Sequence, residues 1–150
     1  MANLARSGLR IRKEVEKHPA EKASASADTL VQLAGGAELF RAPDGTAYAD
    51  IRVQDHRETW AIRSRGFRRW LVGMFFKATR GAPSSAAFQA ALNVLEAKAQ
   101  FEGPERPVFV RVGGLDGRLY LDLADASWRS VEILPGRWRV VDNCAVRFRR

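Results

Sequence analysis

The period of the hydrophobic pattern changes near Ser64, and this change constrains the fold of the 150-residue chain more than any other feature. Before it, alternate residues from Ala47 to Val53 are apolar, which is typical of a β-strand with one buried face. After it, apolar residues from Phe67 to Ala78 recur at the spacing of a helix. A second helical segment and more alternating strands follow. The sequence therefore predicts an α+β domain.

Caps and turns predict where these elements begin and end. The first helix is expected from Asp28 as its N-cap to the glycines at 35–36, followed by a β-meander of about three strands between residues 38 and 62. A Gly-Ala-Pro turn should separate two helices. We expect the first from residue 64 to 80, and the second from a serine cap at 84 or 85 to about 101. Four strands in antiparallel hairpins should follow, at 108–112, 118–123, 128–133 and 137–141.

The composition indicates one globular domain in a reducing compartment. Residues 1–27 alternate charges with small side chains, so we expect a flexible basic tail or linker there and a single domain over 28–150. The only cysteine is Cys144, which excludes an intramolecular disulfide and is interpreted as a packing residue. The apolar run at 70–76 is shorter than the ~18 residues of a membrane span. With no apolar leader at its start, the chain is expected to be cytoplasmic and without a membrane partner.

A D-G-x-x-Y-x-D pattern occurs twice, at 44–50 and at 116–122. Neither copy has the ligand spacing of a calcium loop, and each Asp-Gly favours a hairpin turn. In the strand after each turn, Tyr and Asp should point away from an alanine or leucine face. Asp50 and Asp122 would form an acid–base pair only if their strands were neighbours. We find no metal-ligand cluster and no nucleotide-binding loop, so the sequence predicts no cofactor and no enzymatic activity.

Positive charge is concentrated in the first helix after the change in period. The chain has a net charge of +8, and residues 63–80 contain six basic residues and no acidic one. Clustered positive charge favours a polyanionic partner, above all DNA bound nonspecifically through its phosphates. The predicted contacts are Arg63, Arg65, Arg68, Arg69, Lys77 and Arg80, together with Arg147, Arg149 and Arg150 at the C-terminus. The alternative is a solvated face with ion pairs to the acidic meander.

Three polar or aromatic residues are candidates for contacts to bases. Phe76 lies among the arginines, where it either stacks on a base or packs against a second element. Two helices joined by a short turn and followed by a hairpin also suggest a winged helix-turn-helix. In that arrangement Gln89 and Asn93 of the second helix would contact base edges, and residues 113–117 would form the tip of the wing.

Five stretches of the chain carry a resemblance to a known class of proteins. They are AELFRAPDGTAYADI, HRETWAIRSRGFRRWL, APSSAAFQAALNVLEAKAQFEGPERPVFVRV, DGRLYLDLADASWRSVEI and VRFRR. Together they resemble the segment that precedes the ATPase domain in primase-helicase-like proteins of phages and other mobile elements. The resemblance covers residues 28–150, and no ATPase or primase residue can be carried over onto matching positions. The chain looks like the connecting domain alone.

This resemblance implies a role in the DNA replication of a mobile element. We therefore expect a noncatalytic nucleic-acid-binding or domain-coupling module, with DNA and a helicase-type ATPase encoded nearby as its partners. The alternative is a protein-interaction domain that docks onto an ATPase or associates with itself, without direct contact to DNA. Val72, Phe76 and the edges of the β-sheet would then form the contact surface.

Overall fold

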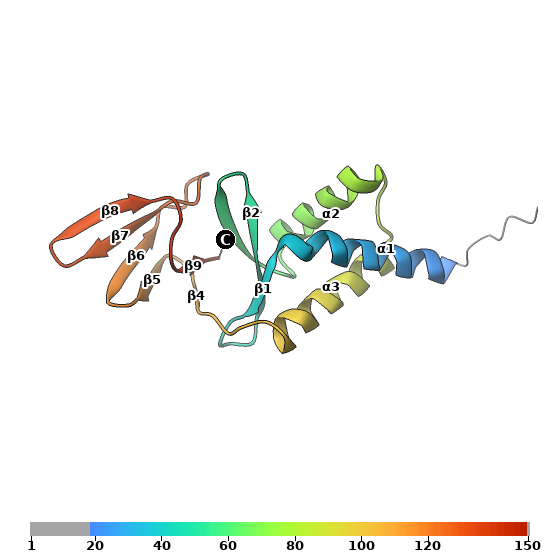
Figure 1. Ribbon diagram of the computed structural model, residues 1–150, viewed down its shortest axis with the longest axis horizontal. Helices are drawn as coiled ribbons and strands as arrows, with labels where there is room; N and C mark the ends of the chain where they lie inside the picture. The colour runs from blue at the N-terminus through green and yellow to red at the C-terminus, as the bar shows by residue number, and fades with distance from the viewer. Residues whose placement is uncertain (1–18, 150) are drawn as a thin grey trace, which may run out of the picture.

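The computed structural model describes residues 19–149 and confirms the predicted α+β fold. Figure 1 shows helices packed on a three-stranded sheet at one end of the molecule and a second, four-stranded sheet at the other. The helices are α1 (Pro19–Leu33), continued by the 3-10 turn η1 (Ala34–Gly36), α2 (Arg65–Thr79) and α3 (Ser85–Phe101). The first sheet contains β1 (Glu38–Arg41), β2 (Ala47–Val53) and β3 (His56–Ala61).

Helix α1 is longer than the sequence predicted. It begins at Pro19, whereas Asp28 was expected to be its N-cap, so residues 19–27 belong to the helix and not to a flexible tail. Leu30 and Ala34 are completely or almost completely buried, and α1 packs closely against α3. Residues 1–18 of the predicted tail lie outside the described part of the chain.

The predicted meander is present, with strand order β1-β2-β3 and antiparallel pairing throughout. Ala47, Ala49 and Ile51 face the helices, as the alternation predicted. The opposite face of β2 is buried too, because Tyr48 packs there with Phe40, Ala42 and Val108. A strand expected to be half-buried is therefore covered on both sides.

Serine caps define the starts of α2 and α3, as predicted. The Ser64 hydroxyl accepts a hydrogen bond from the amide of Phe67, and Ser84 does the same for Ala87. The end of α2 differs in one detail from the expectation. Arg80, and not Gly81, has the left-handed conformation (φ 56°) that closes this helix.

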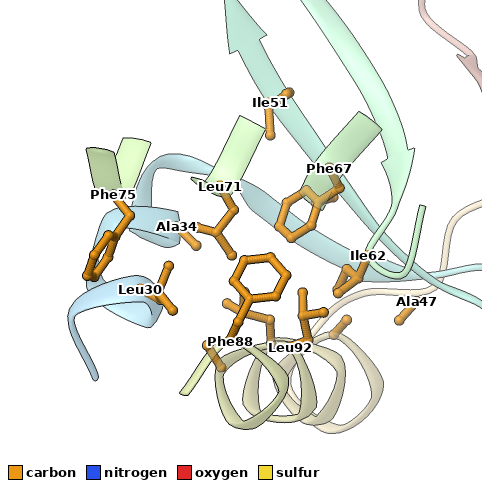
Figure 2. Packing of buried hydrophobic residues seen from close by; sticks show 14 residues of the cluster. Leu30, Ala34, Ala47, Ile51, Ile62, Phe67, Leu71, Phe75, Phe88 and Leu92 are labelled. Atoms are coloured by element: carbon orange, nitrogen blue, oxygen red, sulfur yellow. The ribbon is translucent and has the colours of Figure 1, made fainter. Parts of the chain in front are cut away.

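One apolar core joins the helices to the first sheet. Figure 2 shows side chains from all three helices meeting above β2, with Phe67, Leu71 and Phe88 at the centre. These three residues are at most 6% exposed. The spacing of Phe67, Leu71 and Phe75 gives α2 one buried stripe, so the arginines of the same helix face outward.

The second sheet is an antiparallel meander with strand order β5-β6-β7-β8. Its strands are β5 (Val112–Leu115), β6 (Arg118–Asp122), β7 (Ser130–Leu134) and β8 (Arg137–Val141). Two residues join β5 to β6, Asp116 and Gly117, and both have positive φ, as a tight hairpin turn requires. Gly113 and Gly114 lie within β5. The turn is therefore formed by Asp116 and Gly117 alone, within the tip predicted at 113–117.

The side chains of β6 lie on opposite faces of the second sheet, as their alternation predicted. Tyr120 and Asp122 point away from Leu119 and Leu121. The burial of these faces is unusual, because Tyr120 and Asp122 are buried whereas the leucines are exposed. Tyr120 packs in a small cluster with Phe109, Cys144, Val146 and Phe148.

A short parallel pair, which the sequence did not predict, lies between the two sheets. It joins β4 (Val108–Phe109) to β9 (Arg147–Phe148). The Arg57 side chain donates hydrogen bonds to the carbonyls of Cys144 and Val146, and Trp60 contacts Trp128 edge to face. The C-terminal segment therefore connects the β1–β3 sheet to the β5–β8 sheet.

The winged-helix arrangement stays a prediction. Hairpin β5–β6 does follow α3 in the chain, but Figure 1 shows it at the opposite end of the molecule from the turn between α2 and α3. Hairpin β5–β6 therefore does not lie beside the basic helix α2.

Candidate nucleic-acid interface

An open groove of about 1060 Å³ runs between α2 and α3. One wall comes from the outward face of α2 and the other from the start of α3, with the turn at Ala82 and Pro83 closing one end. Four of the predicted contacts, Arg63, Arg65, Arg68 and Arg69, line this groove, together with Val72, Gly73, Phe76, Ser85, Phe88 and Gln89. The structure thus gathers arginines from successive turns of α2 around one concave surface.

Arg63 is fixed by the outer strip of α3. Its guanidinium donates to Gln89 Oε1 at 3.1 Å, to Asn93 Oδ1 at 2.6 Å and to Glu96 Oε2 at 2.5 Å. The hydrogen bond from Arg63 lowers the pKa of Glu96, which stays ionised in neutral solution. Arg63 therefore crosses from the start of α2 to α3 and ties the two walls of the groove together.

This network revises the role predicted for Gln89 and Asn93. Both were expected to present their amides to base edges, but their side-chain oxygens accept hydrogen bonds from Arg63. Gln100, on the same strip, donates to the carbonyl of Gly45 and so holds the β1–β2 turn. The outer strip of α3 is therefore structural, and reading of bases by these amides is not supported.

Phe76 is open to solvent, which removes one of its two predicted roles. It is 52% exposed in the groove, so it is not buried against a second element. The guanidinium of Arg80 lies 6.0 Å from the centre of its ring. Arg68 lies in the same way over Phe88, at 5.4 Å. The groove therefore combines positive charge with an accessible aromatic ring.

Three arginines in the groove have no carboxylate partner among the described residues. Among the described residues, no ion pair involves Arg65, Arg68 or Arg69. Arg65 and Arg69 are one helical turn apart, so both extend from the same side of α2. The alternative of a solvated face paired to the acidic meander is not supported for these three residues. Lys77 and Arg80 lie on the same helix outside the groove lining.

Two of the three C-terminal arginines are described, and they differ in burial and partners. Arg147 Nε contacts Asp50 Oδ2 at 2.7 Å, and the Arg147 side chain is only 15% exposed. The contact of Arg147 with nucleic acid stays a prediction, and in this structure its guanidinium holds a buried carboxylate. Arg149 is exposed, and its amide donates to the carbonyl of Phe109. Arg150 lies outside the described residues.

The aspartates of the repeated pattern belong to different sheets. Asp50 in β2 accepts from Thr59 and Arg147, whereas Asp122 in β6 lies 3.7 Å from Arg111 and accepts from the amide of Ala124. The two carboxylates therefore bind different arginines, Asp50 also lying 3.7 Å from Arg57, and each has a structural role. Burial raises the pKa of the Cys144 thiol, which packs beside Tyr120 as predicted for a core residue.

The groove lining includes residues that sequence reasoning did not assign to a site. Gly73 opens the groove, because a Cβ built there meets no atom within 4 Å, and Phe88 forms part of its floor. The wheel of α2 indicated the exposed positions of this helix, but no sequence signal indicated that α3 would form the second wall.

Comparisons with known proteins identify no relative of this chain. The chain matches no protein-family model, no curated protein and no solved structure. Across residues 19–149, no three His, Cys, Asp or Glu side chains are grouped so that they could hold a metal ion. None of the helices described over this range has the length and apolar character needed to span a membrane.

Proposed function

We propose that this chain is a noncatalytic nucleic-acid-binding module and that the groove between α2 and α3 binds a single strand of DNA. The observation that carries this proposal is the groove itself, in which Arg65, Arg68 and Arg69, without an ion pair among the described residues, lie near an exposed phenylalanine. Proteins that bind single strands without sequence preference combine these two features, positive charge for the phosphates and an aromatic ring for a base.

The arginines and the aromatic ring would have separate tasks. Arg65, Arg68 and Arg69 would contact successive phosphates, and Phe76 would stack on one base. Arg63, whose charge is paired with Glu96, would hold the two walls of the groove together. Because the amide oxygens of Gln89 and Asn93 are already engaged, the bound strand should be recognised with little sequence preference.

The wider biological role is also part of this proposal. The resemblance of residues 28–150 to the segment before the ATPase of primase-helicase-like proteins supports a role in the DNA replication of a mobile element. In that role, the module would hold a strand and couple it to a helicase-type ATPase.

Fluorescence anisotropy with labelled single-stranded and duplex DNA of several sequences tests the groove. With about three phosphate contacts to a single strand, the affinity should fall about twentyfold between 50 and 200 mM salt. Binding that does not depend on salt would contradict the proposal, and so would a clear preference for duplex DNA.

Variants that remove equal charge from different places locate the binding surface. Arg65→Ala with Arg69→Ala should weaken binding about tenfold or more and lower the salt slope. Arg52→Ala with Arg137→Ala removes the same charge from exposed positions outside the groove and should have a small effect. Equal losses in the two double variants would contradict the assignment of the groove.

A third variant adds a negative charge to the groove and keeps every arginine. Gly73→Glu would place a carboxylate where open space now faces the phosphates, and it should weaken binding more than Gly35→Glu, a matched change at another uncrowded glycine. Unchanged binding in Gly73→Glu would show that the strand lies elsewhere.

A further inference from the structure

One face of the β5–β8 sheet is entirely apolar, and nothing among residues 19–149 covers it. Cross-strand neighbours form two rows on this face, Val112–Leu121–Val131–Val140 and Gly114–Leu119–Ile133–Trp138. Trp138 is 70% exposed, Val112 57% and Leu119 53%. Exposed apolar residues normally occur singly, so eight neighbouring positions on one face need an explanation.

The charged residues of these strands all lie on the opposite face. Arg118 and Arg139 contact Glu132 there, at 3.1 and 2.5 Å, and Tyr120 donates to the same carboxylate. Of the residues described in β5–β8, none on the apolar face carries a charge. The chain has a net charge of +8, and this face is an uncharged area on a basic protein.

The size of the face matches what a dimer requires. Together with Val110 and Leu123 at its margin, it exposes on the order of 700 Å², more than the few hundred Å² expected of an ordinary monomer surface. Two such faces in contact would bury roughly 1,400 Å², which lies within the range of stable, specific interfaces.

We propose that a second copy of this chain covers the face, with the two β5–β8 sheets packed against each other as a two-fold symmetric sandwich. An isologous contact needs a surface that is complementary to itself, and an uncharged, apolar sheet face meets that condition. Two molecules of charge +8 repel each other across most other surfaces, but here they bring no like charges together. A partner of opposite charge would find no complementary group on this face.

Dimerisation by strand pairing at the β8 edge is less favourable than contact between the two apolar sheet faces. The edge strand β8 is short, begins after Pro135 and carries Arg137 and Arg139, features that discourage the addition of another strand. Figure 1 shows this sheet at the far end of the molecule from α2 and α3. The proposed dimer would therefore present two α2–α3 grooves, at its two ends. The dimer does not depend on what those grooves bind.

Sedimentation equilibrium over a range of concentrations tests this proposal. The chain should sediment as a dimer of two 16.7 kDa subunits at micromolar concentration. Leu119→Arg with Trp138→Arg should weaken dimerisation at least a hundredfold, because charges would be buried against an apolar face. Phe101→Arg with Val94→Arg changes two other exposed apolar residues, on α3, and should leave the dimer intact.

Circular dichroism should show that both double variants keep the wild-type fold. If the arginine pair prevents folding, Leu119→Ala with Trp138→Ala replaces it and should still weaken the dimer at least tenfold. A wild-type chain that remains monomeric at about 100 µM would overturn the proposal and leave the face to a different protein. A dimer that persists unchanged in both face variants would overturn it as well.

Discussion

The β1–β3 sheet and the β5–β8 sheet are both antiparallel meanders, but they differ in what covers them. Three described helices cover the first sheet, and its central strand β2 is buried on both faces. Within the described part of the chain, only the side of the second sheet that carries Tyr120 is covered, by a small cluster from β4, β9 and the C-terminal segment. The burial of a strand therefore depends on which other elements reach it, and its own alternation is not sufficient.

The two copies of the D-G-x-x-Y-x-D pattern show this difference at matching positions. Tyr48 and Tyr120 are equally buried, at 2% each. The alternating partners differ, because Ala49 in the first copy is fully buried whereas Leu121 in the second is 38% exposed. A small residue lies beneath the helices, and larger leucines face outward on the second sheet. This distribution is expected if the second sheet is completed by another molecule.

The largest expected effect compares two leucines, one from each region. Leu71→Ala should destabilise the protein by about 2–5 kcal/mol, because it leaves a cavity in the core shared by the helices and β2. Leu119→Ala should change the stability of the monomer by less than about 0.5 kcal/mol. Urea denaturation at low protein concentration measures both. A large loss for Leu119→Ala in dilute monomer would show that the second sheet has a cover within the chain.

The next comparison uses the second aspartate of each repeated pattern. Asp50→Asn should cost about 3 kcal/mol, because it removes the nearer carboxylate of the largely buried Arg147, whose other acidic partner, Glu38, lies 3.7 Å away. Asp122→Asn should cost about 1 kcal/mol, since Arg111 lies 3.7 Å away and is 55% exposed to water.

Denaturation of the two aspartate variants under the same conditions distinguishes them. Thr59→Val is a useful third measurement, because it removes only the hydroxyl that donates to Asp50 and keeps the side-chain volume. Its cost should lie below that of Asp50→Asn. Equal losses for the two aspartates would mean that the junction at Asp50 is no more important than an ion pair whose arginine is exposed.

Local signals in the sequence predicted most of the elements. The serine caps, the Gly-Ala-Pro turn and the change in period placed α2 and α3 within a residue or two of their observed bounds. The start of α1 was missed because residues 19–27 lack a regular apolar stripe. The parallel pair β4–β9 was missed because it joins two-residue strands that lie far apart in the chain.

The candidate site was predictable only in part. The helical wheel of α2 correctly indicated an exposed basic face with Phe76 in it, because these positions follow from local geometry alone. The engagement of Gln89 and Asn93 by Arg63 depends on the angle between two helices, which the sequence does not specify. For the same reason, the burial of Arg147 against Asp50, across 97 positions of the chain, was not predicted.

The smallest effect compares two adjacent glycines on opposite faces of β5. A Cβ at Gly113 would lie 2.6 Å from the ring of Phe109, so Gly113→Ala should cost about 1–3 kcal/mol by displacing that ring from its cluster. A Cβ at Gly114 would meet its nearest atom at 3.7 Å, so Gly114→Ala should be neutral or slightly stabilising. Urea denaturation of dilute monomer gives both values. If Gly114→Ala were the more costly change, the apolar face would already be packed against part of its own chain, and no second molecule would be needed to cover it.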